Sequence, residues 1–211
     1  DRDEAFAPYR HEHRYGVLSR WAWANGCIAG LEHADRARCQ RLDLVLAALA
    51  VRQGERVADV GAGTGFFTIP LAREVGPAGL VWAIDVVPEL LEHLVRRLRL
   101  EQIENVQPVR GALDDPRLLP GEAQTILLAD TLHCVREPTT FLRRLRTGLA
   151  SGGRVAVIEH APRPGAERPW SPPPGRPFPR EAADAAMAQA GLLPAEAFDF
   201  LPEQYFVVYR A

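Results

Sequence analysis

Three regularly spaced glycines and one following acid carry the clearest chemical signal in the sequence. Gly61, Gly63 and Gly65 lie between a strand-like run and a helix-like run. Such a loop lets backbone N–H groups approach a ligand that any Cβ would push away. Asp85 closes the next predicted strand, 20 residues after Gly65, where a carboxylate can accept hydrogen bonds from both hydroxyls of a ribose. The loop and the acid together predict a nucleoside-binding site.

The glycine spacing argues against a dinucleotide as the ligand. The sequence reads Gly-x-Gly-x-Gly, whereas the dinucleotide fingerprint is Gly-x-Gly-x-x-Gly/Ala with a helix N-terminus aimed at the pyrophosphate. Phe66 stands where that fingerprint has its third small residue, and a bulky side chain disfavours the close helix approach that a dinucleotide needs. An NAD-dependent oxidoreductase is therefore kept as an alternative only, since a hydride-transfer signature such as Tyr-x-x-x-Lys is not recognisable either.

Polar residues follow the predicted fourth and fifth strands, where they could act on a ligand held by the loop. Open α/β sheets bind ligands at the carboxyl ends of their strands, which places Asp130, His133, Glu159 and His160 along one edge. His133 is the best general-base candidate because imidazole titrates near neutral pH. Its alternative role is to pack or to cap a loop. Glu159 is a candidate for substrate contact, with hydrogen bonding to a loop as its alternative.

Alternating strands and helices would position these residues. Strand-like runs alternate with amphipathic helical runs along most of the sequence. This alternation predicts an α/β fold with a parallel sheet covered on both faces. The predicted strands are 56–60, 80–84, 106–109, 125–129 and 154–159, and the predicted helices are 41–50, 66–75, 88–100, 138–150 and 180–190. Residues 196–201 and 204–210 are predicted to form a closing antiparallel hairpin.

Two segments lie outside this alternation. Residues 1–40 lack a sustained period and are predicted to be a wrapping or lid segment, whereas residues 41–211 are predicted to form one domain. Eight of the 18 prolines fall within residues 162–179, which predicts a stiff, extended loop that cannot donate to a sheet ladder. Aromatic residues of the first segment could close over a ligand, with core packing or a partner surface as alternatives. They are Phe6, Tyr15, Trp21 and Trp23.

The composition excludes several partners and chemistries. A net charge of -2, from 25 basic and 27 acidic residues, provides no global positive field for nucleic acid or anionic lipid. No apolar run approaches the roughly 18 residues of a membrane span. All basic residues are Arg, which excludes Schiff-base lysine chemistry and a P-loop lysine. We predict no nucleic-acid and no membrane partner, and a cytoplasmic location, although a leader segment could precede Asp1.

The histidines and cysteines do not predict a metal centre. Their spacings match no closed tetrahedral site. The residues concerned are His11, His13, His33, Cys27 and Cys39. With Cys134, the cysteines are three in number and widely spaced, as expected for reduced thiols that each serve as a small buried hydrophobe.

Taken together, the motifs resemble those of the class I S-adenosylmethionine-dependent methyltransferases. Residues 59–65 resemble the first motif of the family, and Ala83-Ile84-Asp85 its acidic ribose clamp. Residues 111–114 resemble the adenine-contacting turn, in which many relatives carry an acid in place of Ala112. Residues 128–133 resemble the fourth-strand motif that borders the methyl donor. The resemblance extends from about residue 41 to residue 210 and is strongest to a bacterial group of small methyltransferases.

This resemblance implies a Rossmann-like, doubly wound fold whose seven-stranded, mostly parallel sheet has an antiparallel C-terminal strand. It also implies S-adenosyl-L-methionine as the cofactor. The implied cofactor-binding residues are Asp59, Gly61, Ala62, Gly63, Gly65, Asp85, Val86, Ala112, Leu113, Asp114 and Asp130. His133 and Glu159 are then the candidate catalytic residues.

The expected reaction is in-line methyl transfer, for which a protein supplies orientation, exclusion of water and sometimes a base. A site covered by two lid segments favours a small-molecule acceptor over a duplex or a folded protein. We therefore expect a methyltransferase that acts on a small molecule. One alternative is a non-catalytic sensor or scaffold that binds S-adenosylmethionine. Another is thiolate binding of arsenic, as in arsenite methyltransferases, although the three cysteines do not align with that pattern.

Overall fold

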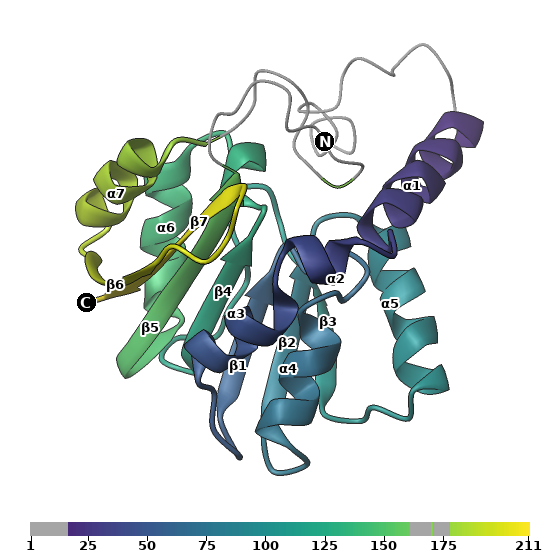
Figure 1. The fold of residues 1–211 in the computed structure, drawn as a ribbon, viewed down its shortest axis with the longest axis horizontal. Helices are drawn as coiled ribbons and strands as arrows, with labels where there is room; N and C mark the ends of the chain where they lie inside the picture. Colours follow the sequence, from purple (N-terminus) through teal and green to yellow (C-terminus); the bar gives the residue numbers. More distant parts are fainter. Residues whose placement is uncertain (1–16, 161–169, 171–177) are drawn as a thin grey trace.

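A single sheet organises the computed structural model, which describes residues 17–160, 170 and 178–211 (Figure 1). The strands are ordered β3-β2-β1-β4-β5-β7-β6. Their bounds are β1 Arg56–Val60, β2 Leu80–Asp85, β3 Val106–Arg110, β4 Ala123–Ala129, β5 Leu149–His160, β6 Leu193–Phe198 and β7 Gln204–Arg210. Neighbours from β3 to β5 pair in parallel, and β7 runs antiparallel to both β5 and β6. The prediction of a mostly parallel seven-stranded sheet with an antiparallel C-terminal strand is confirmed.

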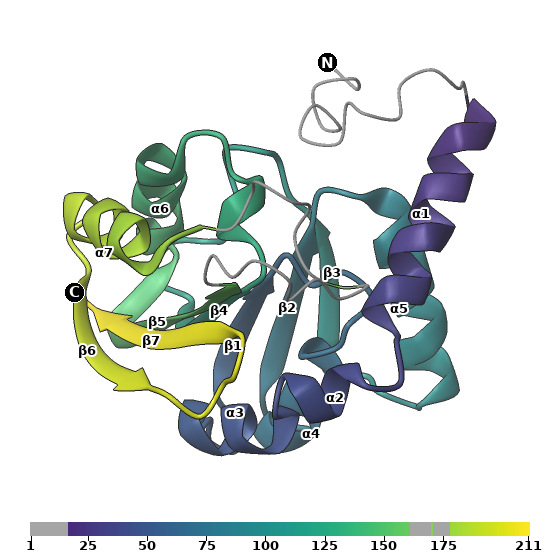
Figure 2. The same ribbon diagram turned by 45° about the horizontal axis from the view of Figure 1, so that its top comes forward.

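Helices cover both faces of this sheet (Figures 1 and 2). α3, α4 and α5 pack on one face, and α6 and α7 on the other. Their bounds are α3 Leu42–Leu49, α4 Thr68–Val75, α5 Pro88–Leu100, α6 Pro138–Thr147 and α7 Arg180–Gln189, preceded in the chain by α1 Val17–Leu31 and α2 Arg36–Cys39. A short 3-10 helix, Leu132–Cys134, follows β4. No helix among the described residues is long and apolar enough to cross a bilayer.

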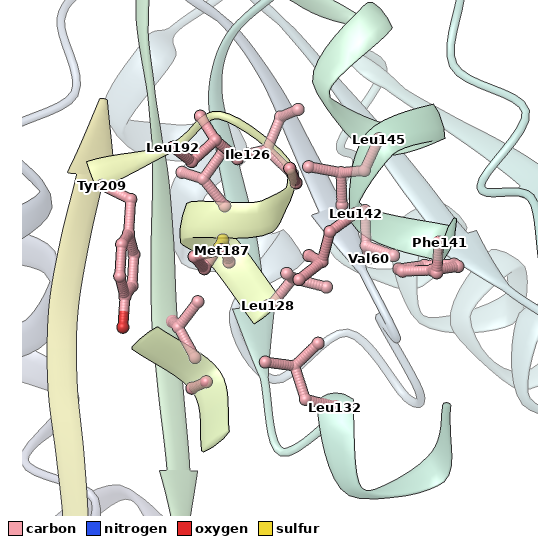
Figure 3. Packing of buried hydrophobic residues seen from close by; sticks show 14 of the residues in the cluster. Val60, Ile126, Leu128, Leu132, Phe141, Leu142, Leu145, Met187, Leu192 and Tyr209 are labelled. Atoms are coloured by element: carbon pink, nitrogen blue, oxygen red, sulfur yellow. The ribbon is translucent and has the colours of Figure 1, made fainter. Parts of the chain in front are cut away.

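One face of the sheet forms a core with α6 and α7 (Figure 3). Ile126 and Leu128 of β4 point to this face, because side chains alternate along a strand. Leu142 and Leu145 of α6 and Met187 of α7 pack against this face. All five side chains are fully buried. The apolar face of α6 therefore packs against the sheet.

The opposite face is covered by α3, α4 and α5. Val45 and Leu49 of α3 and Leu71 of α4 are buried against this face, as their helical spacing predicts. Leu94 and Leu98 of α5 complete a neighbouring cluster. These contacts fix α4 and α5, the helices that follow β1 and β2 in the chain, and thereby the two loops that join them to the sheet.

Proline and glycine mark several helix ends. α5 and α6 each begin with a proline, Pro88 and Pro138, at a position where the missing N–H costs least. α4 ends before Gly76, which adopts a φ of 65°, a left-handed conformation that favours glycine. These local signals explain why the predicted helix boundaries are close to the observed ones.

Residues 17–40, for which the sequence predicts no particular helix or strand, contain α1 and α2. α1 packs against α5 and points away from the sheet (Figure 2). Its sequence places apolar residues on all sides and includes Gly26 and Gly30, and glycine is a poor helix former. Neither periodicity nor propensity therefore indicates this helix.

The start of β5 corrects one prediction from the sequence. The sequence predicts a helix to residue 150 and a strand from residue 154, whereas α6 ends at Thr147 and β5 begins at Leu149, opposite Ala123. A register shift between Ala123 and Thr125 accommodates the irregularity, and Gly152 adopts a φ of 72°. A bulge and a turn share the same glycine signal. β6 also occupies Leu193–Phe198 rather than the predicted 196–201.

Candidate functional site

The candidate site lies where the carboxyl ends of β1, β2 and β4 meet. β2 and β4 flank β1, so the strand order reverses at β1. At such a reversal the loops diverge and leave a crevice for a ligand. The glycine loop, residues 61–65, follows β1, Asp85 ends β2 and Asp130 follows β4. The topology thus places the strongest sequence signals at one edge of the sheet.

The glycine loop has little room for side chains. Gly61, Gly63 and Gly65 adopt φ values of 82°, 55° and 89°, which favour glycine. A Cβ on Gly61 would stand 2.2 Å from Thr131 Oγ1, and one on Gly65 would stand 2.4 Å from Leu94 Cδ1. Both conformation and space therefore require glycine at the ends of the loop.

Asp85 is hydrogen-bonded to this loop. Its Oδ2 accepts the backbone N–H of Gly63 at 2.8 Å, and its Oδ1 accepts that of Val87 at 2.9 Å. Burial raises the pKa of Asp85, while hydrogen bonds from the Val87, Gly63 and Val86 backbones partly offset that rise. The backbone N–H groups of Gly61 and Ala62 donate to Ile84 O at 2.8 and 3.0 Å. The two halves of the predicted nucleoside site are thus joined by hydrogen bonds.

Asp59, near the end of β1, is buried. Its Oδ2 accepts the hydroxyl of Thr68 at 2.6 Å, which ties β1 to the first residue of α4. Burial raises the pKa of Asp59 to about 6, and the nearby Asp85 charge contributes to the rise, against the hydrogen bond from Thr68. The observed contact of Asp59 is therefore with the helix that follows the loop.

The predicted adenine turn is only partly brought to the site. Gly111 donates its N–H to Asp85 O at 3.0 Å, and Ala112 pairs with Asp115, so this turn lies beside the end of β2. Ala112 and Leu113 are half-buried. The Asp114 side chain, however, is 62% exposed and forms an ion pair with Arg144 of α6. In the structure the Asp114 carboxylate is engaged by α6.

His133 and Glu159 form a second polar cluster at the same edge. His133 lies in the 3-10 helix after β4, and Glu159 is next to last in β5. His133 Nδ1 lies 2.8 Å from Glu159 Oε1, and the His133 backbone N–H donates to Oε2 at 3.3 Å. The side chains are 8% and 0% exposed. The contact between Nδ1 and Glu159 holds the imidazole ring in one orientation.

This cluster favours a protonated imidazole. Burial by itself lowers the pKa of His133, but hydrogen bonds to Cys134 and Glu159 and the Glu159 charge outweigh it, and the pKa rises to about 11. At neutral pH the ring is then an imidazolium paired with a buried carboxylate. An imidazolium donates hydrogen bonds, so the resting pair is suited to orient a ligand atom.

Asp130 is held in a cradle of buried polar side chains. Gln40 Nε2 donates to Oδ2 and Gln204 Nε2 to Oδ1, each at 2.7 Å. A guanidinium nitrogen of Arg36 lies 4.0 Å from Oδ2, and His160 Nε2 lies 3.5 Å from Oδ1. The five side chains are at most 9% exposed. We call these five residues the Asp130 cradle.

The sequence prediction of Asp130 as a ligand contact did not include Arg36, Gln40 or Gln204. Arg36 and Gln40 lie in the segment without periodicity, and Gln40 is 90 residues away from Asp130. A glutamine among aperiodic residues carries no sequence signal for such a contact.

Residues 31–40, which we call the N-terminal cover, cross the glycine loop. The Leu31 Cδ1 atom lies 3.2 Å from where a Cβ on Gly63 would stand. The Arg36 guanidinium lies 4.1 Å from the ring centroid of Phe66, directly after the loop. The cover therefore contacts both the middle of the loop and the residue that follows it.

Contacts at either side hold the N-terminal cover in place. Glu32 lies 2.8 Å from His93 Nε2 and 3.4 Å from an Arg97 nitrogen, both on α5. On the other side, the ring centroids of His33 and Trp170 are 5.3 Å apart. The cover thus contacts α5 on one side and Trp170 on the other.

Much of the predicted lid lies outside the described residues. This holds for Phe6 and Tyr15, for the side chains of Trp21 and Trp23, and for the proline-rich loop except Trp170, Phe178 and Pro179. Trp170 is buried. In the described part, residues 31–40 are the portion of the predicted lid that reaches the site.

The described residues contain no group of three or more His, Cys, Asp or Glu side chains that could hold a metal ion. Cys27, Cys39 and Cys134 are half-buried thiols. Cys134 is hydrogen-bonded to His133, so it belongs to the polar cluster rather than to the apolar core.

Comparison with known proteins agrees with this geometry. A family model described as "Methyltransferase domain" matches residues 57–153, which span β1 to the start of β5. The chain is 32% identical over 115 residues to the protein-L-isoaspartate O-methyltransferase of Ignicoccus hospitalis, covering 54% of this chain and 52% of that protein. It is 33% identical over 118 residues to the demethylmenaquinone methyltransferase of Staphylococcus aureus, covering 54% and 47%. The matches span about half the length of these relatives.

The fold also matches a solved structure along most of its length. A crystal structure described as a SAM-dependent methyltransferase from Aquifex aeolicus superposes with a TM-score of 0.81 at 22% identity, covering 88% of this chain and 97% of that chain. At this identity the likeness establishes the fold, including the parts of the chain beyond residues 57–153.

Proposed function

The chain contains a domain of the class I S-adenosylmethionine-dependent methyltransferase family, and from this premise we propose that it binds S-adenosylmethionine at the glycine loop and transfers the methyl group to a small-molecule acceptor. The observation that carries the proposal is the hydrogen bond between Gly63 N and Asp85 Oδ2, at 2.8 Å. It joins the loop and the acid in one site at the reversal of strand order.

The residues present fit this cofactor. Asp85 accepts one backbone N–H on each oxygen, and a carboxylate oxygen has a further lone pair for a ribose hydroxyl. The buried Thr64 Oγ1 has no hydrogen-bond partner among the described residues, and buried hydroxyls are normally satisfied. We assign the ribose to Asp85, the amino-acid part to residues 61–65, and the adenine to the turn at Ala112 and Leu113.

The bound cofactor supplies an electrophilic methyl group, and the residues of the chain orient the acceptor and exclude water. The N-terminal cover shields the loop from one side through Leu31 and Arg36. Glu159 fixes the His133 ring, and in this proposal the ring lies beside the acceptor and orients it. In this proposal His133 and Glu159 orient the acceptor at neutral pH, and proton removal by His133 requires conditions in which the ring is neutral.

A small acceptor is supported by the covered site. The names of the two curated relatives give different acceptors, so this part of the proposal rests on the chain's own geometry. The cover contacts the glycine loop through Leu31, and the buried Trp170 lies against His33 of the cover. A small molecule is more readily enclosed between such walls than a folded protein.

Calorimetry with S-adenosylhomocysteine, the demethylated cofactor, tests the donor site. Asp85→Asn should weaken binding by about 1–3 kcal/mol, because buried partners of the carboxylate lose a charged acceptor. The matched control is Asp43→Asn, whose side chain is 72% exposed on α3, and it should bind like the wild type. An Asp85→Asn variant that binds S-adenosylhomocysteine as tightly as the wild type would contradict the assignment of the ribose to Asp85.

A second experiment separates catalysis from other roles. The protein is incubated with isotope-labelled S-adenosylmethionine and a fractionated small-metabolite extract, and labelled products are identified by mass spectrometry. A labelled small molecule supports the proposal. Binding without any labelled product would favour a sensor or scaffold, and binding of NADH in place of S-adenosylhomocysteine would favour an oxidoreductase.

A further inference from the structure

The Asp130 cradle joins three parts of the chain that are distant in sequence. Gln40 ends the N-terminal cover, Asp130 follows β4, and Gln204 begins β7; Gln40 is 90 residues from Asp130 and 164 from Gln204. Each Asp130 oxygen receives an amide donor at 2.7 Å. A buried carboxylate cannot turn to water for donors, so these two amides hold it in one orientation.

The backbone conformation of Asp130 connects the orientation of its carboxylate to the glycine loop. Asp130 adopts a φ of 53°, a left-handed conformation that persists in a non-glycine residue when its surroundings hold it. The turn leads directly into Thr131, whose hydroxyl is 2.9 Å from Val60 O and 3.0 Å from Ala129 O. The same Thr131 oxygen lies 2.2 Å from where a Cβ on Gly61 would stand. The conformation of Asp130 therefore determines the position of the Thr131 side chain against Gly61 of the glycine loop.

Gln40 also connects in the opposite direction, toward the N-terminal cover. Its Oε1 accepts from Arg36 Nε at 2.7 Å, and Arg36 donates further to Leu31 O at 3.0 Å. Leu31 in turn contacts the glycine loop at Gly63. One buried amide, 1% exposed, thus uses its oxygen to hold the cover and its nitrogen to hold Asp130.

We propose that Gln40 is a positioning residue of the donor site, which sets both walls of the glycine loop: one through Asp130 and Thr131, the other through Arg36 and Leu31. This inference rests on the proposed function, because the site is the donor site proposed above. It makes the N-terminal cover a fixed part of that site rather than a lid that detaches when the cofactor enters or leaves.

Reversing the polarity of the Gln40–Asp130 pair tests the inference. Q40E places two carboxylates face to face, and D130N places two amides face to face. In the double variant Q40E/D130N, the new amide at position 130 donates to the new carboxylate at position 40, while its oxygen still accepts from Gln204. The hydrogen bond that Gln40 Nε2 donates to Gln204 Oε1 at 3.2 Å is lost in both Q40E and the double variant. Arg36 keeps an acceptor at position 40. Asn also tolerates the left-handed conformation at position 130.

Binding of S-adenosylhomocysteine is measured by calorimetry for each variant. Each single variant should bind at least about tenfold more weakly than the wild type, since a buried pair is broken. The double variant should bind more tightly than either single variant, because the Gln40–Asp130 pair is restored although the Gln40–Gln204 hydrogen bond is not. Single variants that bind like the wild type, or a double variant that binds no more tightly than the better single variant, would overturn the inference. A double variant that fails to fold would also overturn it, whereas folding and binding by the double alone supports it.

The matched control is Q53E. Gln53 also donates through Nε2 to a chain oxygen, Glu74 O at 2.7 Å, but it lies before β1 and is exposed. Its substitution should leave the affinity for S-adenosylhomocysteine unchanged. Equal weakening by Q53E and Q40E would overturn the inference.

Hydrogen exchange separates this inference from the proposed function. The backbone amides of residues 36–41 and 131–134 should exchange faster in both single variants than in the wild type, and more slowly in the double variant than in either single variant. This comparison needs no ligand. A wild-type protein that binds neither S-adenosylhomocysteine nor S-adenosylmethionine would refute the proposed function, and unchanged exchange in the single variants would refute the cradle.

Discussion

At the scale of single residues, burial decides which form of each titratable group is present. Asp59 and Asp85 both have raised pKa values because burial disfavours their charges. The pKa of His133 is raised to about 11, because the interactions with Cys134 and Glu159 outweigh the effect of burial. The site therefore combines acids that are costly to ionise with an imidazole that holds its proton.

Glu159 should account for part of the raised pKa of His133, after the hydrogen bond with Cys134. In Glu159→Gln the pKa should fall toward the ordinary value of 6.5, because the carboxylate no longer stabilises the imidazolium. NMR titration of the imidazole signals measures this change, with the His133 signal identified by its loss in His133→Gln. Glu101→Gln, on a carboxylate paired with Arg73 and Arg97, is the control and should leave the titration unchanged.

The same shift sets the sign of a pH effect on stability. The pKa of His133 in the folded protein lies above 6.5, so its pairing contributes stability that is fully present below pH 6.5 and is lost as the pH rises through about 11. The free energy of unfolding should therefore decline over this alkaline window more in the wild type than in Glu159→Gln. A wild-type His133 that titrates near 6.5 would contradict both expectations.

At the scale of elements, packing of α6 on the sheet holds the 3-10 helix that carries His133. Leu132, next to His133, is fully buried in the cluster that contains Leu142 and Leu145 of α6 (Figure 3). Because protein interiors are densely packed, removing side-chain volume here should disturb the packing of the whole cluster. The position of His133 therefore depends on the packing of this core.

Leu142→Ala should lower the free energy of unfolding by about 2–5 kcal/mol, because it removes a fully buried side chain and leaves a cavity. Chemical denaturation followed by circular dichroism measures the change. Leu119→Ala is the control, since Leu119 is 65% exposed, and it should change the stability by less than about 0.5 kcal/mol. Equal losses at both positions would contradict the packing of α6.

At the scale of the whole molecule, the proposed donor site is made of segments that are distant in the chain. It comprises the glycine loop, the turn after β3, the end of β4, the start of β7 and the N-terminal cover. A ligand that binds across these segments stabilises the folded state as a unit, because the unfolded chain does not present the site.

S-adenosylhomocysteine at about 100 times its dissociation constant should therefore add about 2.7 kcal/mol to the free energy of unfolding. For a chain of this size the midpoint of thermal unfolding should rise by about 5–10 °C. Differential scanning calorimetry checks the value. Asp85→Asn at the same ligand concentration should show a smaller rise, and a rise with NADH alone would contradict the proposed donor.

Local sequence patterns are sufficient to predict the α/β class, the order of most strands and helices, and the pairing of the glycine loop with Asp85. These features are encoded by short repeats of apolar residues and by glycine and proline, whose backbone preferences act over a few residues. The resemblance to the methyltransferase family added the sheet topology, which the structure confirms. The roles predicted for individual site residues remain predictions.

Only the tertiary structure decided what the polar side chains contact. Asp114 pairs with Arg144 on α6 rather than facing the site, His133 joins Glu159 from a different strand, and Asp130 is held by Gln40 from a segment with no sequence signal. Such contacts bring together residues tens of positions apart, and a single polar residue has no periodicity that would reveal its partner. Burial and these neighbours then shift the pKa values of the groups. The protonation state of the site therefore depends on the fold.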